Sequence, residues 1–245
     1  MVATAACLPL PDLPPGFELT VLREREDAFR HACNLAPQAG AGSLVWVRRF
    51  DLLEFAVVLE PEEPLASARR AFFPAMSALA DAIGVACPPE KPVEFGWPGT
   101  LLFDGARLGG GRLGWPPECS EEAVPNWLVF GAMLIASKHS TGDPGLTPES
   151  TSLEDEECEL THEALLEAFA RNLMRGFHLW QHQGFQPLAA DYLARLALRA
   201  EGSRADVAEN GDLVVSRAGS AERLAFLPAL AQAAWLDPAT GRPRL

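Results

Sequence analysis

The stretch from Glu94 to Pro116 contains three consecutive glycines, Gly109 to Gly111. Glycine weakens the interior of a β-strand, so a run of three marks a bulge with tight packing, or a backbone that another group must approach closely. In the second case the bare main chain would face a ligand. The residue types alone leave both alternatives open.

Other groups that could carry chemistry are few. Lys91 and Lys138 are the only lysines, against eighteen arginines, so a reaction that needs a catalytic lysine has little to draw on. His178 and His182 have the spacing of a helical metal pair, but no third ligand pattern accompanies them, which favours exposed histidines and no evident metal site. The acidic run 154–157 is typical of a solvated loop.

Composition excludes several classes of partner. The chain has 245 residues, a hydrophobic content of 48% and a net charge of −13. Such acidity argues against nucleic acid or an anionic membrane as the main partner. No apolar run approaches the roughly 18 residues of a membrane span.

The five cysteines are scattered and form no CxxC pair, which favours reduced thiols over a disulfide framework or a zinc site. The first residues lack a basic segment and are interrupted by prolines, which makes a poor signal peptide. We therefore expect a cytoplasmic protein.

The elements that would position these groups follow from periodicity and turn residues. We expect a helix from Val21 to about Ala36, a hairpin of strands 43–50 and 53–61, and a helix from Pro64 to Gly84 that Pro74 kinks. Asp104-Gly105 predicts a tight hairpin turn between Glu94 and Pro116. A further strand is expected over 127–137.

In the second half of the sequence, Thr161 is a candidate N-cap for a long helix that Gly184 ends. Another helix is expected to begin at Pro187. Short strands follow, with a turn over 209–212. We expect a Pro-rich lead-in (1–16), a main domain (17–197) and a small β-rich unit (198–245). The fold class is α+β, with a mixed, largely antiparallel sheet and packed helices.

The order of residues around the glycines resembles the central motif of the biotin/lipoate protein ligase superfamily. That motif reads Lys-Trp-Pro-Asn-Asp, a short strand, Asn-Gly, a basic residue and lysine, then Leu-Ala-Gly. Here Trp97 and Pro98 match the Trp-Pro, Gly105 matches the turn glycine, and Arg107 matches the second lysine. Similar segments extend the resemblance over roughly residues 20–197. It implies the ligase catalytic-domain fold, related to class II synthetases.

The resemblance also implies a two-step reaction. In that family the carboxylate of the cofactor attacks the α-phosphate of ATP, and the acyl adenylate then transfers to a lysine of a carrier domain. Cations beside the phosphate stabilise the charge that develops there. The family supplies them from the motif lysine and from a loop rich in arginine and glycine.

This chain departs from both elements. Gly96 stands at the lysine position, and Gly99 and Thr100 replace the Asn and Asp. If 42–47 is the first core strand, Arg48 and Arg49 precede a shortened loop; in another register, residues 39–42 are its remnant. Either way the Arg-Gly repeat is absent, which puts ATP chemistry in doubt. The thiol route of the related octanoyl transferases is also disfavoured, because the segment directly after the 127–137 strand contains Lys138 but no cysteine.

The resemblance implies a pocket between the glycine hairpin and the 43–60 strands, for biotin, lipoate or a related acyl group. The ligand-binding residues it implies are Arg107, for a carboxylate or phosphate, with Arg48, Arg49, Trp97, Gly109, Gly110, Gly111 and Arg112. Two functions stay open. One is a ligase-like acyl transfer enzyme with a degenerate site. The other is a non-enzymatic module that binds an acyl ligand or an acyl-carrier domain.

Overall fold

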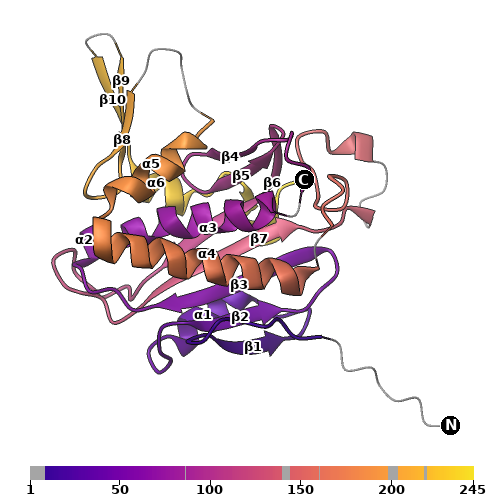
Figure 1. Ribbon diagram of the computed structural model, residues 1–245, viewed down its shortest axis with the longest axis horizontal. Coiled ribbons are helices and arrows are strands. Elements are labelled where there is room, and N and C mark those ends of the chain that lie inside the picture. The colour runs from indigo at the N-terminus through magenta and orange to yellow at the C-terminus, as the bar shows by residue number, and fades with distance from the viewer. Residues whose placement is uncertain (1–8, 86, 140–143, 160, 198–203, 218–219) are drawn as a thin grey trace.

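A seven-stranded mixed sheet forms the centre of the protein in the computed structural model, which describes residues 9–85, 87–139, 144–159, 161–197, 204–217 and 220–245 (Figure 1). Its strand order is β1-β2-β3-β7-β6-β5-β4. β1 and β2 are parallel, and the other neighbours are antiparallel. The strands are β1 (Glu18–Leu22), β2 (Ser43–Val47), β3 (Leu52–Leu59), β4 (Val93–Gly96), β5 (Thr100–Phe103), β6 (Ala106–Gly114) and β7 (Leu128–Ile135). The expected fold class is confirmed.

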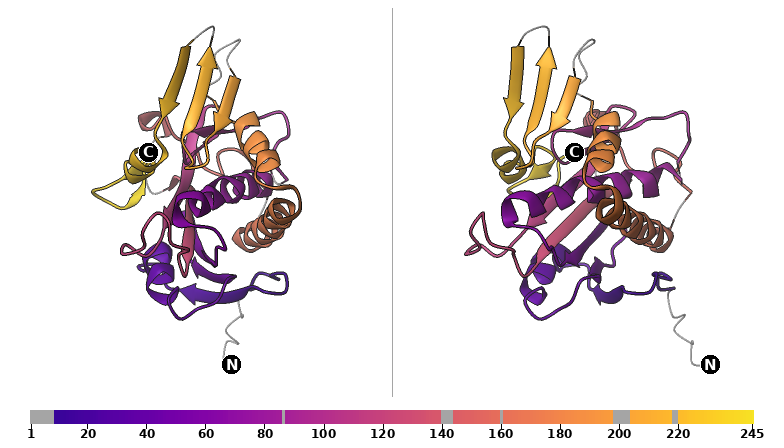
Figure 2. Two further views of the ribbon diagram at one scale, coloured as in Figure 1. Left: turned by 90° about the vertical axis from the view of Figure 1, so that its left-hand side faces the viewer. Right: turned by 60° about the vertical axis from the view of Figure 1, so that its left-hand side comes forward.

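Helices cover both faces of this sheet (Figure 2). Successive residues of a strand point to opposite faces, so Leu44 and Trp46 of β2 join one core cluster while Val45 and Val47 join another. The first cluster packs against α3 (Phe72–Gly84), α4 (His162–Gln183) and α5 (Gln186–Ala194). The second packs against α1 (Ala28–Leu35). None of the helices in the described ranges has the length and apolarity to cross a membrane.

Most of the residues expected to form turns or to begin and end helices do so. Asp104 and Gly105 both have positive φ, 49° and 79°, as a two-residue hairpin turn requires. The Thr161 side chain accepts a hydrogen bond from the Ala164 N–H at the start of α4, and Gly184 ends that helix with φ of 77°. Near Pro74, the expected single helix divides into α2 (Leu65–Ala68), a 3-10 turn (Arg69–Ala71) and α3. The expected helix from Val21 is wrong at its start, because 18–22 pair with β2 as an edge strand.

Beyond α5 the chain forms a second, smaller group of elements. β8 (Arg204–Val207), β9 (Leu213–Arg217) and β10 (Ser220–Leu224) make a three-stranded sheet that projects from one end of the molecule (Figures 1 and 2). α6 (Phe226–Ala231) follows, and β11 (Leu236–Asp237) pairs with β12 (Arg242–Pro243). This part therefore includes a helix that the expectation of short strands omitted. The predicted boundary at 198 lies outside the described residues and stays a prediction.

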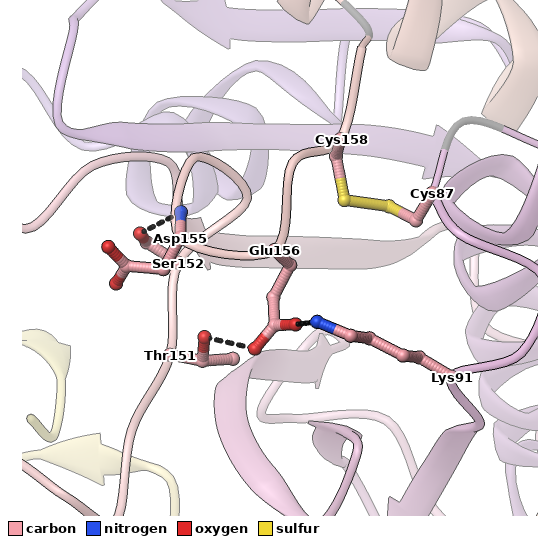
Figure 3. The surroundings of a disulfide bond; sticks show 7 residues. All are labelled: Cys87, Lys91, Thr151, Ser152, Asp155, Glu156 and Cys158. Atoms are coloured by element: carbon pink, nitrogen blue, oxygen red, sulfur yellow. Dashed lines mark hydrogen bonds and ion pairs between the residues drawn. A yellow bond between two sulfur atoms is a disulfide. The ribbon is translucent and has the colours of Figure 1, made fainter.

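The expectation that all cysteines are reduced is wrong. Cys87, after α3, and Cys158, before α4, form a disulfide across 71 residues of sequence (Figure 3). The same loop is held by the Glu156 carboxylate, which accepts hydrogen bonds from Lys91 Nζ at 2.6 Å and Thr151 Oγ1 at 2.5 Å. Sequence spacing carries no information about this pairing, because the fold alone brings the two ends of the helices together.

Candidate functional site

The three glycines of β6 are packed against the protein's own atoms. A Cβ on Gly110 would lie 2.5 Å from the Trp235 ring, and one on Gly111 would lie 2.5 Å from the Met76 sulfur. Gly109 has φ of 155° and lies against the Met133 carbonyl, next to a register shift between β5 and β6. The alternative of a bulge with tight packing is confirmed. Contact of these glycines with a ligand stays a prediction.

Trp97 lies in an aromatic cluster on the α3 face of the sheet. Its ring stacks on Phe73, with ring centroids 5.9 Å apart, and is 6.3 Å from Tyr192 and 6.0 Å from Phe226. The Tyr192 hydroxyl donates to the carbonyl oxygen of the neighbouring Pro98 at 2.7 Å. This indole therefore serves packing between the 97–99 turn, α3 and α5.

Arg107 lines a pocket of about 730 Å³ on the opposite face. One wall comes from the sheet, with Leu52 of β3 and Ile135 of β7, and the other from residues 234–245. Arg107 Nη1 donates to the Arg244 carbonyl at 3.2 Å, and Nη2 is 3.4 Å from the Glu149 carboxylate. The side chain of Glu149 is 79% exposed, so this ion pair is weak. The guanidinium group of Arg107 thus places a positive charge beside a cavity whose wall includes apolar side chains.

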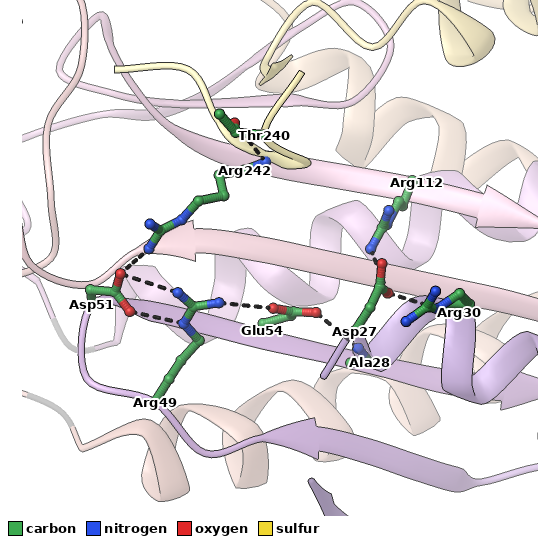
Figure 4. A network of polar contacts seen from close by, with 9 residues as sticks. All are labelled: Asp27, Ala28, Arg30, Arg49, Asp51, Glu54, Arg112, Thr240 and Arg242. Carbon is green, nitrogen blue, oxygen red and sulfur yellow. Dashed lines mark hydrogen bonds and ion pairs between the residues drawn. The ribbon is translucent and has the colours of Figure 1, made fainter. Parts of the chain in front are cut away.

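The other predicted residues do not line this pocket. Arg48 lies over the Trp46 ring and 3.7 Å from Glu163 of α4, on the α3 side of the sheet. Arg49 and Arg112 belong to a polar network on the α1 face (Figure 4). Arg112 Nη2 donates to Asp27 at 3.2 Å and its guanidinium lies over the Phe29 ring.

Asp51 links this network to the pocket, whose lining it shares. It accepts a hydrogen bond from Arg49 Nε at 2.8 Å and pairs with Arg242. Burial opposes the charge of Asp51, but the hydrogen bond from Arg49 and the charges of Arg49 and Arg242 lower its pKa. Asp51 therefore stays ionised and connects the sheet to the 235–244 segment.

Glu54 of β3 is the most buried acid of the network, at 2% exposure. Its Oε1 accepts a hydrogen bond from the Ala28 N–H at 2.8 Å, and Arg49 Nη1 lies 3.6 Å from Oε2. Burial raises the pKa of Glu54 above its ordinary 4.5, with Asp27 acting in the same direction; the Ala28 N–H, Arg112 and Arg49 oppose the rise. The folded protein thus favours the protonated acid more than the unfolded chain does.

This raised pKa predicts a pH dependence. As the pH rises from 4.5 through the folded-state pKa, the wild type should lose stability relative to Glu54→Gln, which does not titrate. Urea unfolding of both proteins, from below that window to neutral pH, measures the difference. A difference that is flat, or that moves in favour of the wild type as the pH rises, would contradict the assignment.

The family resemblance aligns the motif lysine with Gly96. A Cβ on Gly96 would lie 3.1 Å from Thr100. Lys91 is held by Glu156. β2 and β3 are joined by residues 48–51 alone, which is consistent with the register in which Arg48 and Arg49 precede a shortened loop.

Other candidate groups remain apart from the pocket. His178 and His182 are exposed, as expected, with ring centroids 4.1 Å apart. In the described part of the chain, no group of three or more His, Cys, Asp or Glu is placed to hold a metal ion. Burial raises the pKa of the Cys33 thiol to about 11, which makes it a poor nucleophile.

The part of the pocket that sequence reasoning missed is the segment 235–244. The residue types favour a hairpin turn here and could have predicted it: Asp237-Pro238-Ala239-Thr240-Gly241. Nothing local places this hairpin beside Arg107, which lies 137 residues earlier than Arg244.

Comparison with known proteins agrees with this architecture. The profile of the biotin/lipoate A/B protein ligase family matches residues 13–194. A biotin–[acetyl-CoA-carboxylase] ligase of Paracoccus denitrificans is 29% identical over 183 residues, which are 72% of this chain and 69% of that protein.

Among solved structures, the likeness covers up to 90% of this chain. A biotin protein ligase-like protein of unknown function from Silicibacter sp. TM1040 has a TM-score of 0.76 and 27% identity, covering 90% of this chain and 98% of its own. Biotin protein ligase from Aquifex aeolicus in complex with biotin and ATP shares the fold, with a TM-score of 0.63 and 12% identity over 84% of this chain and 95% of its own. This chain belongs to the biotin/lipoate A/B protein ligase family.

Proposed function

We propose that this protein binds a biotinyl, lipoyl or short acyl group in the pocket at Arg107, without forming an acyl adenylate by the family's usual route. The observation that carries the proposal is the placement of Arg107 at the rim of a 730 Å³ cavity with Leu52 and Ile135 in its wall. A guanidinium group beside an apolar wall suits a ligand with a carboxylate and a hydrocarbon chain.

Two features support binding without ATP chemistry. The family's motif lysine is replaced by Gly96, and residues 48–51 leave no room for an arginine-rich loop between β2 and β3. Loss of one preorganised group that stabilises developing charge costs about 10²–10³ in rate. Loss of several would leave little catalysis.

The second candidate is ligase-like acyl transfer with a degenerate site, in which arginines replace the missing lysine. The similarity to the Paracoccus ligase favours it, and the Aquifex ligase binds biotin and ATP. Phosphate stabilisation needs only the charge of an arginine. Under this candidate the partner would be a carrier domain such as that of the carboxylase named for the Paracoccus protein.

Titration calorimetry with biotin, lipoate and octanoate tests binding, and ATP–pyrophosphate exchange with the same acids tests adenylation. We expect binding of at least one acid and no exchange. Exchange with any of them would establish the second candidate. Absence of binding by all three would contradict both.

Arg107→Gln should weaken binding of that acid by about tenfold to a hundredfold, because a hydrogen bond to a charged group contributes about 1.5–3 kcal/mol. Calorimetry of the variant measures the loss. The matched control is Arg217→Gln, an exposed arginine of β9 outside the pocket. Equal affinities for the wild type and Arg107→Gln would remove Arg107 from the site.

The sequence favours a cytoplasmic location, and this stays a proposal. The Cys87–Cys158 disulfide argues in the other direction, because disulfides are more frequent in oxidising compartments. Fractionation of the source cells, with alkylation of free thiols before lysis, tests both the location and the redox state.

A further inference from the structure

The 235–244 hairpin is anchored on the glycines of β6. Trp235 is 1% exposed, and its Nε1–H donates to the Gly111 carbonyl at 3.2 Å. Its ring lies where a Cβ on Gly110 would be, and it packs with Leu52, Met133 and Ile135. The bare backbone of β6 therefore makes room for this indole.

The hairpin beyond Trp235 is internally held. Asp237 accepts hydrogen bonds from the Ala239 N–H at 3.0 Å and the Thr240 hydroxyl at 2.8 Å. These two donors lower the pKa of Asp237, and the charge of Arg244 acts in the same direction. The Arg244 N–H donates to the Trp235 carbonyl at 2.8 Å, and Arg242 pairs with Asp51. The hairpin is thus closed on itself by its own main chain, and the side chains of Trp235 and Arg242 hold it against the sheet.

This arrangement brings two guanidinium groups to one cavity from distant parts of the sequence. Arg107 and Arg244 both line the pocket. Arg244 Nε donates to the Leu236 carbonyl at 3.1 Å, while its two Nη groups have no hydrogen-bond partner among the described residues. The three acids that line the pocket, Asp51, Glu149 and Asp237, already have partners: Asp51 pairs with Arg242, Glu149 with Arg107, and Asp237 accepts the Thr240 hydroxyl.

We propose that Arg244 is a second ligand-binding residue, which together with Arg107 contacts the anionic group of the ligand, and that the 235–244 hairpin is a wall of the binding site. This inference rests on the proposed function and adds a second anion-binding residue and a wall to the same site. The site takes an acid whose carboxylate lies between the two arginines and whose apolar part lies against Leu52 and Ile135. Arg242 is a positioning residue, which acts through its ion pair with Asp51.

The test compares octanoate with octanamide, which has the same chain without the charge. Calorimetry is performed on the full chain as wild type, Arg244→Gln, Arg244→Lys, Arg107→Gln and the control Arg217→Gln. We expect Arg244→Gln to weaken octanoate binding by about tenfold, since a charged hydrogen bond is lost, and to leave octanamide binding unchanged. Arg244→Lys should restore part of the octanoate affinity, because it keeps the charge.

Three results would overturn the inference. If Arg244→Gln binds octanoate as the wild type does while Arg107→Gln does not, the hairpin is not part of the site and the proposed function stands. If octanamide loses as much affinity as octanoate, Arg244 has a structural role only. If the wild type binds no acid, the proposed function falls as well.

Discussion

Trp235→Ala is expected to lower the free energy of unfolding by about 3–5 kcal/mol, the usual cost of removing a buried tryptophan. The reason is specific to this fold. The indole fills the space above Gly110, and Gly110 itself has no side chain that could fill the space it would leave. Urea denaturation followed by circular dichroism measures the loss.

Trp235→Phe is the matched control. It keeps an aromatic ring on Gly110 and removes the hydrogen bond to the Gly111 carbonyl, so it should cost much less, about 1–3 kcal/mol. If Trp235→Ala unfolds at the same urea concentration as the wild type, Trp235 does not anchor the hairpin. The assignment of the hairpin as a wall of the pocket would then be wrong as well.

Trp97→Ala is expected to cost about 3 kcal/mol or more of stability and to leave the affinity for the acyl ligand unchanged. This ring contacts Phe73, Tyr192 and Phe226 on the α3 face, and Arg107 lies at a pocket on the other face. Denaturation and calorimetry on the same preparation measure the two effects.

Trp97→Phe separates packing from hydrogen bonding. The Trp97 Nε1–H is buried and has no partner among the described residues, so removing it should cost little. If Trp97→Ala loses ligand affinity without losing stability, Trp97 is a ligand-binding residue, as the family resemblance implies.

Several features could be predicted because their causes are local. The Asp104-Gly105 turn needs two residues that tolerate positive φ, and the start of α4 needs an oxygen at Thr161 to accept the Ala164 N–H. The β2–β3 hairpin follows from two apolar strands with a short connection. The edge strand β1 was missed because it pairs with β2 in parallel, across a helix.

The pocket could not be predicted from local sequence signals alone. The order of residues in a motif made Arg107 a candidate, but the residues that Arg107 contacts could not be predicted in this way. The glycines of β6 were ambiguous because glycine makes room equally well for a ligand and for a side chain of the same protein. Gly111 and Trp235 are 124 residues apart, and no pattern in either segment refers to the other.

The sequence by itself determined the family, the sheet with its packed helices and the shortness of the 48–51 connection; that Gly96 stands at the position of the motif lysine stays a prediction from the family resemblance. All of these depend on residue identity and spacing along the chain. Tertiary structure alone decided that Cys87 meets Cys158, that the partly buried Trp97 packs against the core and that Arg244 shares a pocket with Arg107. Such contacts join segments far apart in the chain, and only the packing of the whole fold selects which of the many chemically possible partners meet.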